Sequence, residues 1–240
     1  MEKPIMLALD FADFKQVEQF LESFSNPGDL TVKIGMELFY QSGPQVVKTL
    51  KARGCKIFLD LKLFDIPHTV EKSMERIGEL GVDYVTAHTL GGSEMLTAAK
   101  RGLIAGAKRV NQPVPDLLGV TILTSCSKET LANELNCKLA MADQVVSLAK
   151  LAKQSGCDGV ITSALELPML TKEVGTDFKY VVPGIRMKQD AVGDQKRVAT
   201  PEIAKQTGAF AIVVGRPVTQ SENPVAAYRR YRANWNLEGE

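Results

Sequence analysis

The stretch Phe58-Leu59-Asp60-Leu61-Lys62-Leu63-Phe64-Asp65-Ile66-Pro67 joins a buried apolar run to a dense group of charges. Its first half predicts a strand, and the strand ends among Asp60, Lys62 and Asp65. Side chains alternate between the two faces of a strand, so Asp60 and Lys62 are expected on the same face. Carboxylates on both sides of an ammonium favour its charged form. A fixed cation at a strand end suits a reaction that generates a carbanion and then needs a proton.

Seven other apolar runs along the chain are similar to the one that opens this stretch. Each is rich in Val, Ile and Leu and is followed by a segment with helical periodicity. The expected strands are residues 5–10, 31–35, 56–62, 84–89, 117–123, 159–163, 180–184 and 209–216. Eight strand–helix units predict an α/β fold, a (β/α)8 TIM barrel, with a doubly wound open sheet as the alternative. No linker divides the chain, so residues 1–240 are expected to form a single catalytic domain.

The composition excludes several classes of protein. A formal net charge of +1 argues against a general nucleic-acid or membrane-surface binder. Four cysteines are scattered without a CxxC pair, which favours reduced thiols over a disulfide or zinc framework. The N-terminal residues have neither the pattern of a signal peptide nor that of a spanning helix. We therefore expect a cytoplasmic protein without a nucleic-acid or membrane partner.

Charged residues recur near the ends of the expected strands. The members of this group are Asp10, Lys33, Asp60, Lys62 and, in the loop beyond, Asp65. In (β/α)8 barrels the reacting groups lie at the C-terminal ends of the strands. A single charge there is most often a solvated edge or an ordinary salt bridge. Several charges at matching strand positions favour a functional site, because each is costly to bury unless it is paired.

The ends of the last two expected strands indicate a phosphate site. Gly184 and Arg186 follow one strand, and Gly215 and Arg216 end the next. Glycine lets the backbone approach an anion closely, and the fork of an arginine matches phosphate oxygens. Loops in these positions of a barrel often bind phosphate with a helix N-terminus. The polar segment 187–197 is either a plain loop or a lid that closes over the phosphate, with Gln195 reaching in.

The two histidines, His68 and His88, do not have the spacing of a metal site, so we do not expect a histidine-based metal site. His88 is expected to be a buried, hydrogen-bonded side chain. No dinucleotide-binding, P-loop or nucleophile-elbow motif occurs in the chain.

Together these residues resemble the orotidine 5′-phosphate decarboxylase family. The motifs occur in the order of the family and run from residue 8 to residue 220. They are Ala8-Leu-Asp10, Lys33-Ile-Gly35, Asp60-Leu-Lys62-Leu-Phe-Asp65-Ile-Pro67, Leu123-Thr124-Ser125, Pro183-Gly184-Ile-Arg186, Gly193-Asp-Gln195-Lys-Arg197 and Val214-Gly215-Arg216-Pro217-Val-Thr-Gln220.

The resemblance implies a homodimeric barrel that uses no cofactor. By the same resemblance, the enzyme would convert orotidine 5′-phosphate to UMP and carbon dioxide in pyrimidine biosynthesis. Lys62 would protonate C6 of the pyrimidine, and Asp60 would lie beside the departing carboxylate. Asp65 would enter the site from the partner subunit. Lys33, with these three, completes the implied catalytic group.

The resemblance also implies how the substrate is held. Asp10 and Lys33 would bind the ribose, and Thr124 would contact the pyrimidine. The phosphate would be held by Arg186, Gln195, Gly215 and Arg216. Ile66, Pro67 and Thr69 belong to the segment that lies at the shared interface in the family, and they are expected beside the substrate.

Two other functions remain open from the residues alone. A sugar-phosphate decarboxylase or aldolase-like synthase on the same barrel would place the carboxylates of the Asp60–Asp65 motif around a magnesium ion. A non-catalytic sensor of phosphate ligands would need the arginines, but it would have no use for a charged lysine between two carboxylates.

Overall fold

Eight parallel strands pair in chain order, and the pairing of the first with the last closes them into a barrel. A computed structural model describes residues 3–190 and 197–236. The strands are β1 Ile5–Ala8, β2 Thr31–Gly35, β3 Lys56–Leu63, β4 Tyr84–His88, β5 Asp116–Val120, β6 Gly159–Ile161, β7 Lys179–Val182 and β8 Ala211–Val214. The predicted (β/α)8 barrel is therefore confirmed, and the open doubly wound sheet is excluded.

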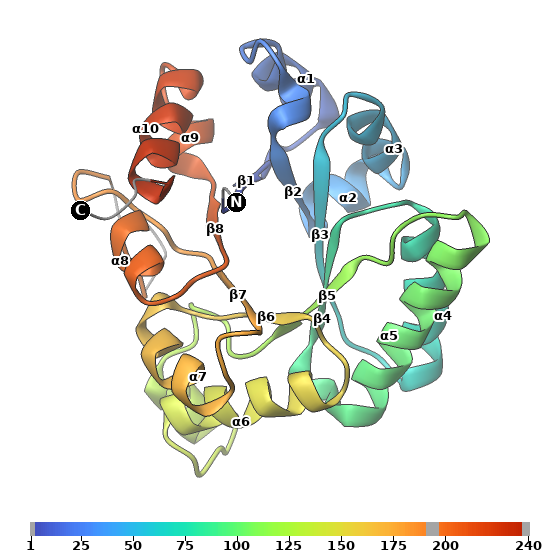
Figure 1. The fold of residues 1–240 in the computed structure, drawn as a ribbon, viewed down its shortest axis with the longest axis vertical. Helices are drawn as coiled ribbons and strands as arrows, with labels where there is room; N and C mark the ends of the chain where they lie inside the picture. Colours follow the sequence, from blue (N-terminus) through green and yellow to red (C-terminus); the bar gives the residue numbers. More distant parts are fainter. Residues whose placement is uncertain (1–2, 191–196, 237–240) are drawn as a thin grey trace.

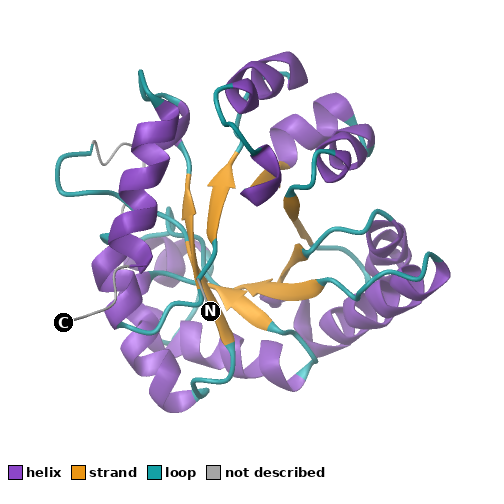
Figure 2. Ribbon diagram, turned by 45° about the horizontal axis from the view of Figure 1, so that its top comes forward, coloured by secondary structure: helices purple, strands orange, loops and turns teal. Residues whose placement is uncertain are grey.

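Helices surround the barrel on its outside, with the strands in the middle (Figures 1 and 2). They are α1 Phe14–Glu22, α2 Met36–Ser42, α3 Gln45–Ala52, α4 Pro67–Glu79, α5 Gly92–Arg109, α6 Met141–Gln154, α7 Leu167–Glu173, α8 Pro201–Gln206, α9 Arg216–Thr219 and α10 Pro224–Asn236. Because every strand is covered by helices outside and by other strands' side chains inside, near-continuous apolar strands are stable here.

Two apolar cores follow from the alternation of side chains along the strands. The larger core lies between strands and helices and includes Leu7, Val32 and Leu59. The smaller core fills the barrel and contains Met6, Ala8, Phe58, Leu118, Val181, Ala211 and Val213. A filled barrel is a rigid platform, so groups attached just above it have fixed positions.

Six of the predicted strands extend beyond the C-terminal ends of the observed strands. Asp10, Ser163, Gly184 and Arg216, for example, lie past the ends of β1, β6, β7 and β8. The reason is local: the chain leaves the hydrogen-bonded ladder to turn towards the next helix before the apolar pattern stops. The polar residues are consequently on the rim of the barrel.

The two ends of the described chain are joined by hydrogen bonds just before β1. The indole Nε1 of Trp235 in α10 donates to the carbonyl of Lys3 at 3.0 Å, and the Lys3 amide donates to Asn236 Oδ1 at 3.2 Å. The Trp235 side chain is fully buried. The last helix therefore fixes the start of β1.

Candidate active site

A cavity of about 320 Å³ opens at the C-terminal ends of the strands. Its floor is the top of the inner core, where Ala8, Phe58, Ile161 and Val213 lie. Its polar walls carry Asp10, Lys33, Asp60, Lys62, Thr124, Thr162, Arg186 and Arg216, together with Gly184 and Gly215. A small apolar floor with convergent polar groups is typical of a site for a small ligand.

Lys33 and Asp10 form the first ion pair of the cavity. Lys33 lies on β2 and is buried, and its Nζ donates to Asp10 Oδ1 at 2.8 Å. Gly35 leaves room for this pair, because a Cβ there would lie 3.0 Å from the Lys33 Nζ. The Asp10 side chain is 56% exposed, so it can also meet a ligand that enters the cavity.

Asp60 and Lys62 form the second ion pair, on β3. The Lys62 Nζ donates to Asp60 Oδ2 at 2.9 Å, and both side chains are mostly buried. Both side chains line the cavity as expected, and the four charges at the barrel mouth form two pairs. The ammonium of Lys62 is thus held over the cavity by a carboxylate.

The backbone around Lys62 is irregular. Leu59 pairs with Val85 of β4, but the next pair is Leu63 with Ala87, so β3 contains two more residues than β4 in this interval. Lys62 has φ 51°, the left-handed region that side chains with a Cβ rarely adopt. Bulges of this kind re-aim side chains next to active sites. The sequence pattern carried no signal of it.

Thr86 of β4 is a residue that sequence reasoning missed. Its hydroxyl accepts a hydrogen bond from the Lys62 amide at 2.8 Å and donates to Asp60 Oδ1 at 3.0 Å. A threonine in a β-rich run reads as an ordinary strand residue, and only the paired strands show what it touches.

The arginine side of the cavity is formed by the ends of β7 and β8. Arg186 is buried, and its Nη1 donates to the carbonyl of Ile185 at 2.8 Å. Arg216 is exposed and begins α9, directly after Gly215. Gly184 has φ 74°, which favours glycine. The two predicted strand ends thus line one cavity with the two lysine–carboxylate pairs.

Thr124 lies half-buried in the loop after β5, and Arg197 holds that loop. The Arg197 Nη2 donates to the carbonyls of Ile122 and Leu123 at 3.2 and 3.0 Å, and its Nη1 pairs with Glu166. Both side chains of this ion pair are mostly buried. Arg197 was predicted only as the end of a lid. Gln195 lies outside the described residues.

Four predicted residues are not in the cavity of their own chain. Asp65 and Thr69 line a neighbouring groove of about 870 Å³ between α2, α3 and α4, while Ile66 and Pro67 lie at the start of α4 without lining either hollow. Asp65 is exposed, and its Oδ1 accepts from the Ile66 amide at 2.6 Å. Lys62 lines both the cavity and the groove, so the two hollows meet at this lysine.

His88 lies outside the cavity lining, half-buried beside the ring of Phe64. Its Nδ1 accepts from the Leu90 amide at 3.4 Å. Burial lowers the pKa of His88, and the charge of Lys62 lowers it further. The prediction of a hydrogen-bonded histidine is met, although the side chain is only half-buried.

Within residues 3–190 and 197–236, no helix is long and apolar enough to cross a membrane. Nor does any group of three His, Cys, Asp or Glu side chains in those ranges gather closely enough to hold a metal ion.

Fold and site together define a (β/α)8-barrel enzyme with a charged pocket for a small anionic ligand at its C-terminal mouth. Comparison with known proteins narrows this class. Residues 3–231 match the model of the orotidine 5′-phosphate decarboxylase / HUMPS family, and the chain belongs to that family.

Curated relatives and a solved structure agree with the family model. The chain is 50% identical over 236 residues to "Orotidine 5′-phosphate decarboxylase" of Lactobacillus acidophilus, covering 98% of this chain and 100% of the relative. It is 50% identical to the protein of the same name from Staphylococcus haemolyticus over 230 residues, which cover 96% and 97% of the two chains. The crystal structure of the L. acidophilus protein superposes with a TM-score of 0.87 at 48% identity, covering 98% of this chain and 100% of that one.

Proposed function

We propose that this chain decarboxylates orotidine 5′-phosphate to UMP and carbon dioxide in pyrimidine biosynthesis, without a cofactor. The observation that carries the proposal is the position of the Lys62 ammonium. It lies 2.9 Å from the Asp60 carboxylate, and both residues line the cavity at the C-terminal mouth of the barrel. The curated relatives that match the chain at about half identity carry the name of this activity.

Lys62 supplies the chemistry. When the bond between C6 and the carboxyl carbon breaks, its electron pair stays on C6, and no ring atom offers a good resonance sink. An ammonium already fixed next to C6 stabilises that developing charge and then transfers its proton from Nζ to C6. The products are UMP and carbon dioxide, and the neutral lysine recovers its proton from water.

Asp60 keeps the ammonium aligned and lies beside the departing carboxylate. Lys33 and Asp10, the second pair in the cavity, are placed to bind the ribose hydroxyls, with Lys33 completing the charged group. Thr124 also lines this cavity. It contacts the pyrimidine. Binding of this kind contributes to the rate where it orders the charged groups around the transition state.

The phosphate is bound by Arg186 and Arg216, with the backbone of Gly215 and the side chain of Gln195. Support comes from the position of both arginines on the same cavity as the lysine pairs. The fork of an arginine matches two phosphate oxygens at once.

Two copies of the chain form the working enzyme, and Asp65 completes the site of the partner subunit. Asp65 faces a groove that adjoins Lys62 and is rimmed by exposed apolar residues. Tyr40, which is 73% exposed, and Phe64, which is 62% exposed, line this groove, and Ile66, which is 66% exposed, follows Asp65 in the chain. Exposed apolar side chains gathered around a groove are typical of an interface. Ile66, Pro67 and Thr69 enter the partner's site together with Asp65.

Mixing two variants tests the shared site. Lys62→Ala and Asp65→Ala are each expected to be inactive alone. After the two are unfolded and refolded together, half of the dimers are mixed, and each mixed dimer has one intact site, so about a quarter of the wild-type activity returns. No recovery on mixing would place Asp65 in its own chain's site or outside catalysis.

A magnesium-dependent sugar-phosphate enzyme is the competing function, because the family model also covers the HUMPS branch. Both carboxylate oxygens of Asp60 already accept hydrogen bonds, one from Lys62 and the other from Thr86. The Lys62 ammonium, 2.9 Å from this carboxylate, would repel a divalent cation bound there, and this observation favours the decarboxylase.

We also propose a cytoplasmic location and one catalytic domain made by the whole barrel.

One assay separates the candidates. The ultraviolet absorbance of orotidine 5′-phosphate is followed after addition of the protein, with and without an excess of EDTA. We expect conversion to UMP that EDTA leaves unchanged. Conversion abolished by EDTA would indicate the metal-dependent branch, and binding of UMP without any conversion would indicate a sensor.

A further inference from the structure

Thr86 lies directly beneath the Asp60–Lys62 pair, on the neighbouring strand. Its side chain is 0% exposed and does not line the cavity, so it is out of reach of a ligand. The same hydroxyl nevertheless touches both members of the pair, accepting from the Lys62 amide at 2.8 Å and donating to Asp60 Oδ1 at 3.0 Å.

The donor and acceptor roles in these two hydrogen bonds of the Thr86 hydroxyl follow from the chemistry of its partners. An amide can only donate, and an ionised carboxylate can only accept, so the one proton of the hydroxyl points to Asp60. The bulge in β3 explains why a side chain is needed at all: the register shift between Leu59 and Leu63 takes the Lys62 amide out of the regular ladder. A buried amide without a partner is costly, and Thr86 provides the partner.

The two carboxylate oxygens of Asp60 have different partners. Oδ1 faces Thr86, and Oδ2 faces the Lys62 Nζ at 2.9 Å. Thr86 thus holds the Lys62 backbone at one end of the pair and the Asp60 carboxylate at the other.

We propose that Thr86 is a positioning residue for the reaction: its hydroxyl holds Lys62 in its left-handed backbone conformation and orients Asp60, so that the ammonium points to the reacting carbon. This inference rests on the proposed function, since it gives Thr86 an effect on the rate of proton transfer from Lys62 to the substrate. It assigns Thr86 no contact with the substrate.

The test compares Thr86→Val with Thr86→Ser. Valine has nearly the shape of threonine but lacks the hydroxyl, whereas serine keeps the hydroxyl and lacks only the methyl group. We measure kcat and KM with orotidine 5′-phosphate, and the affinity for UMP by calorimetry. Because a displacement of about 1 Å at a reacting group can cost on the order of 100-fold in rate, we expect kcat of Thr86→Val to fall roughly 10- to 100-fold.

A loss of kcat without a change in KM or UMP affinity distinguishes a role of Thr86 in positioning from a role in folding. KM and the UMP affinity of Thr86→Val are expected to stay within about threefold of wild type, because the ligand contacts are unchanged. Thr86→Ser is expected to restore kcat to within about threefold of wild type, since the two hydrogen bonds of the hydroxyl are kept.

Thr89→Val is the matched control. Thr89 is likewise fully buried, follows the same strand, and its hydroxyl donates only to the carbonyl of Val120 at 2.7 Å. We expect kcat of this variant to stay within about threefold of wild type, because no charged group depends on that hydroxyl.

Three outcomes would overturn the inference: an unchanged kcat in Thr86→Val, an equal loss in Thr89→Val, or no recovery in Thr86→Ser. Each of these outcomes can be observed only if the wild-type protein converts orotidine 5′-phosphate. An inactive wild-type protein would instead refute the proposed function, and the two failures are therefore distinguishable. Should Thr86→Val fail to fold, Thr86→Ala with the same serine comparison replaces it.

Discussion

At the scale of residues, Lys62 concentrates both the chemistry and the backbone strain of the site. A non-glycine residue in the left-handed region costs on the order of 1–3 kcal/mol, and such residues cluster where function needs a fixed geometry. At φ 51°, Lys62 bears that cost next to the cavity, and Asp60 and Thr86 both hold it. Strain of this kind is stable because the surrounding contacts determine the conformation.

Replacing Lys62 by alanine removes both the electrostatic contact and the proton donor. Each contributes at least about 10²-fold to rate in enzymes, so kcat of Lys62→Ala is expected to fall by at least about 10⁴-fold. Alanine has the same Cβ and the same backbone preference, and cooperative unfolding in urea should persist. Steady-state assays and urea titration measure the two effects.

Lys51→Ala is the matched control for that variant. Lys51 also pairs with an aspartate, Asp83, at 3.3 Å, but at the N-terminal end of the barrel. The kcat of the Lys51→Ala variant should equal that of the wild-type protein. Near-normal turnover in Lys62→Ala would remove the role assigned to this lysine.

Arg216→Ala tests the phosphate contact. Loss of a hydrogen bond to a charged group costs about 1.5–3 kcal/mol, so kcat/KM should fall roughly 10- to 150-fold or more, mainly through KM. Turnover of orotidine, which lacks the phosphate, should be equally slow in Arg216→Ala and in wild type. Arg101→Ala, whose arginine pairs with Glu71 at 2.6 Å between α4 and α5, serves as the control. An unchanged kcat/KM for the phosphorylated substrate would exclude Arg216 from the phosphate site.

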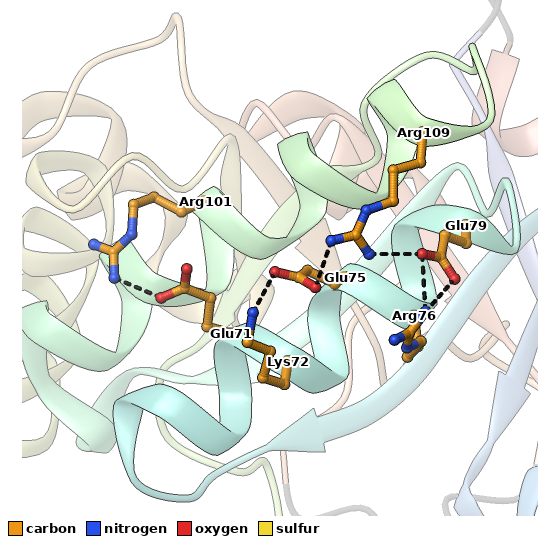
Figure 3. A network of polar contacts seen from close by, with 7 residues as sticks. All are labelled: Glu71, Lys72, Glu75, Arg76, Glu79, Arg101 and Arg109. Atoms are coloured by element: carbon orange, nitrogen blue, oxygen red, sulfur yellow. Dashed lines mark hydrogen bonds and ion pairs between the residues drawn. The ribbon is translucent and has the colours of Figure 1, made fainter.

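At the scale of elements, α4 and α5 form the closest helix pair of the outer layer. Figure 3 shows the polar network that crosses it, with Arg109 bonded to both Glu75 and Glu79, and Arg101 to Glu71. The backbones approach because glycines lie at the contact. A Cβ at Gly106 would be 2.0 Å from the carbonyl oxygen of Glu75, and one at Gly102 would be 2.2 Å from that of Glu71. This pair carries Pro67 and Thr69 at the start of α4.

Gly106→Ala should therefore destabilise the protein. Alanine in a helix is favoured over glycine by about 0.5–1 kcal/mol, but overpacking a close contact costs typically 1–3 kcal/mol or more. We expect a net decrease in the free energy of unfolding, measured by urea titration. Lys108→Ala, an exposed site on the same helix, should change it by less than about 0.5 kcal/mol. Equal or greater stability in Gly106→Ala would show that the two helices can separate without cost.

At the scale of the whole molecule, the closed barrel buries groups from every part of the chain. Of the four cysteines, Cys55 and Cys157 are buried, while Cys126 and Cys137 are partly exposed. Burial raises the pKa of Cys157 to about 12, and burial also raises the pKa of Cys55. Since the thiolate is the reactive form, two of the four thiols should be inert in the folded state.

The native protein should accordingly react with a chromogenic disulfide reagent at two thiols, and the reaction is followed by absorbance at mildly alkaline pH. The other two should react only after unfolding in guanidinium. Cys157→Ser should leave the rapid native reaction unchanged, and Cys126→Ser should remove about half of it. Rapid reaction of all four thiols would show that the barrel opens readily.

The sequence alone determined the barrel and the charged groups on its rim. Eight apolar runs separated by helical periodicity specify parallel strands covered on both faces, because only that environment suits uninterrupted Val, Ile and Leu. The motif around Asp60 and Lys62 predicted that both side chains share one site, and both line the cavity, although a bulge interrupts the regular alternation of the strand there. Both predictions depend on patterns that are local in the chain.

Only the tertiary structure decided how these groups meet. The bulge at Lys62, the hydrogen bonds of Thr86, the clamp of Arg197 on the Thr124 loop and the separation of Asp65 from its own cavity involve residues far apart in the chain. Closing a barrel fixes the register between neighbouring strands, and that register determines which side chains touch. No periodicity within one strand encodes it, because the partner of each group lies on another strand or loop.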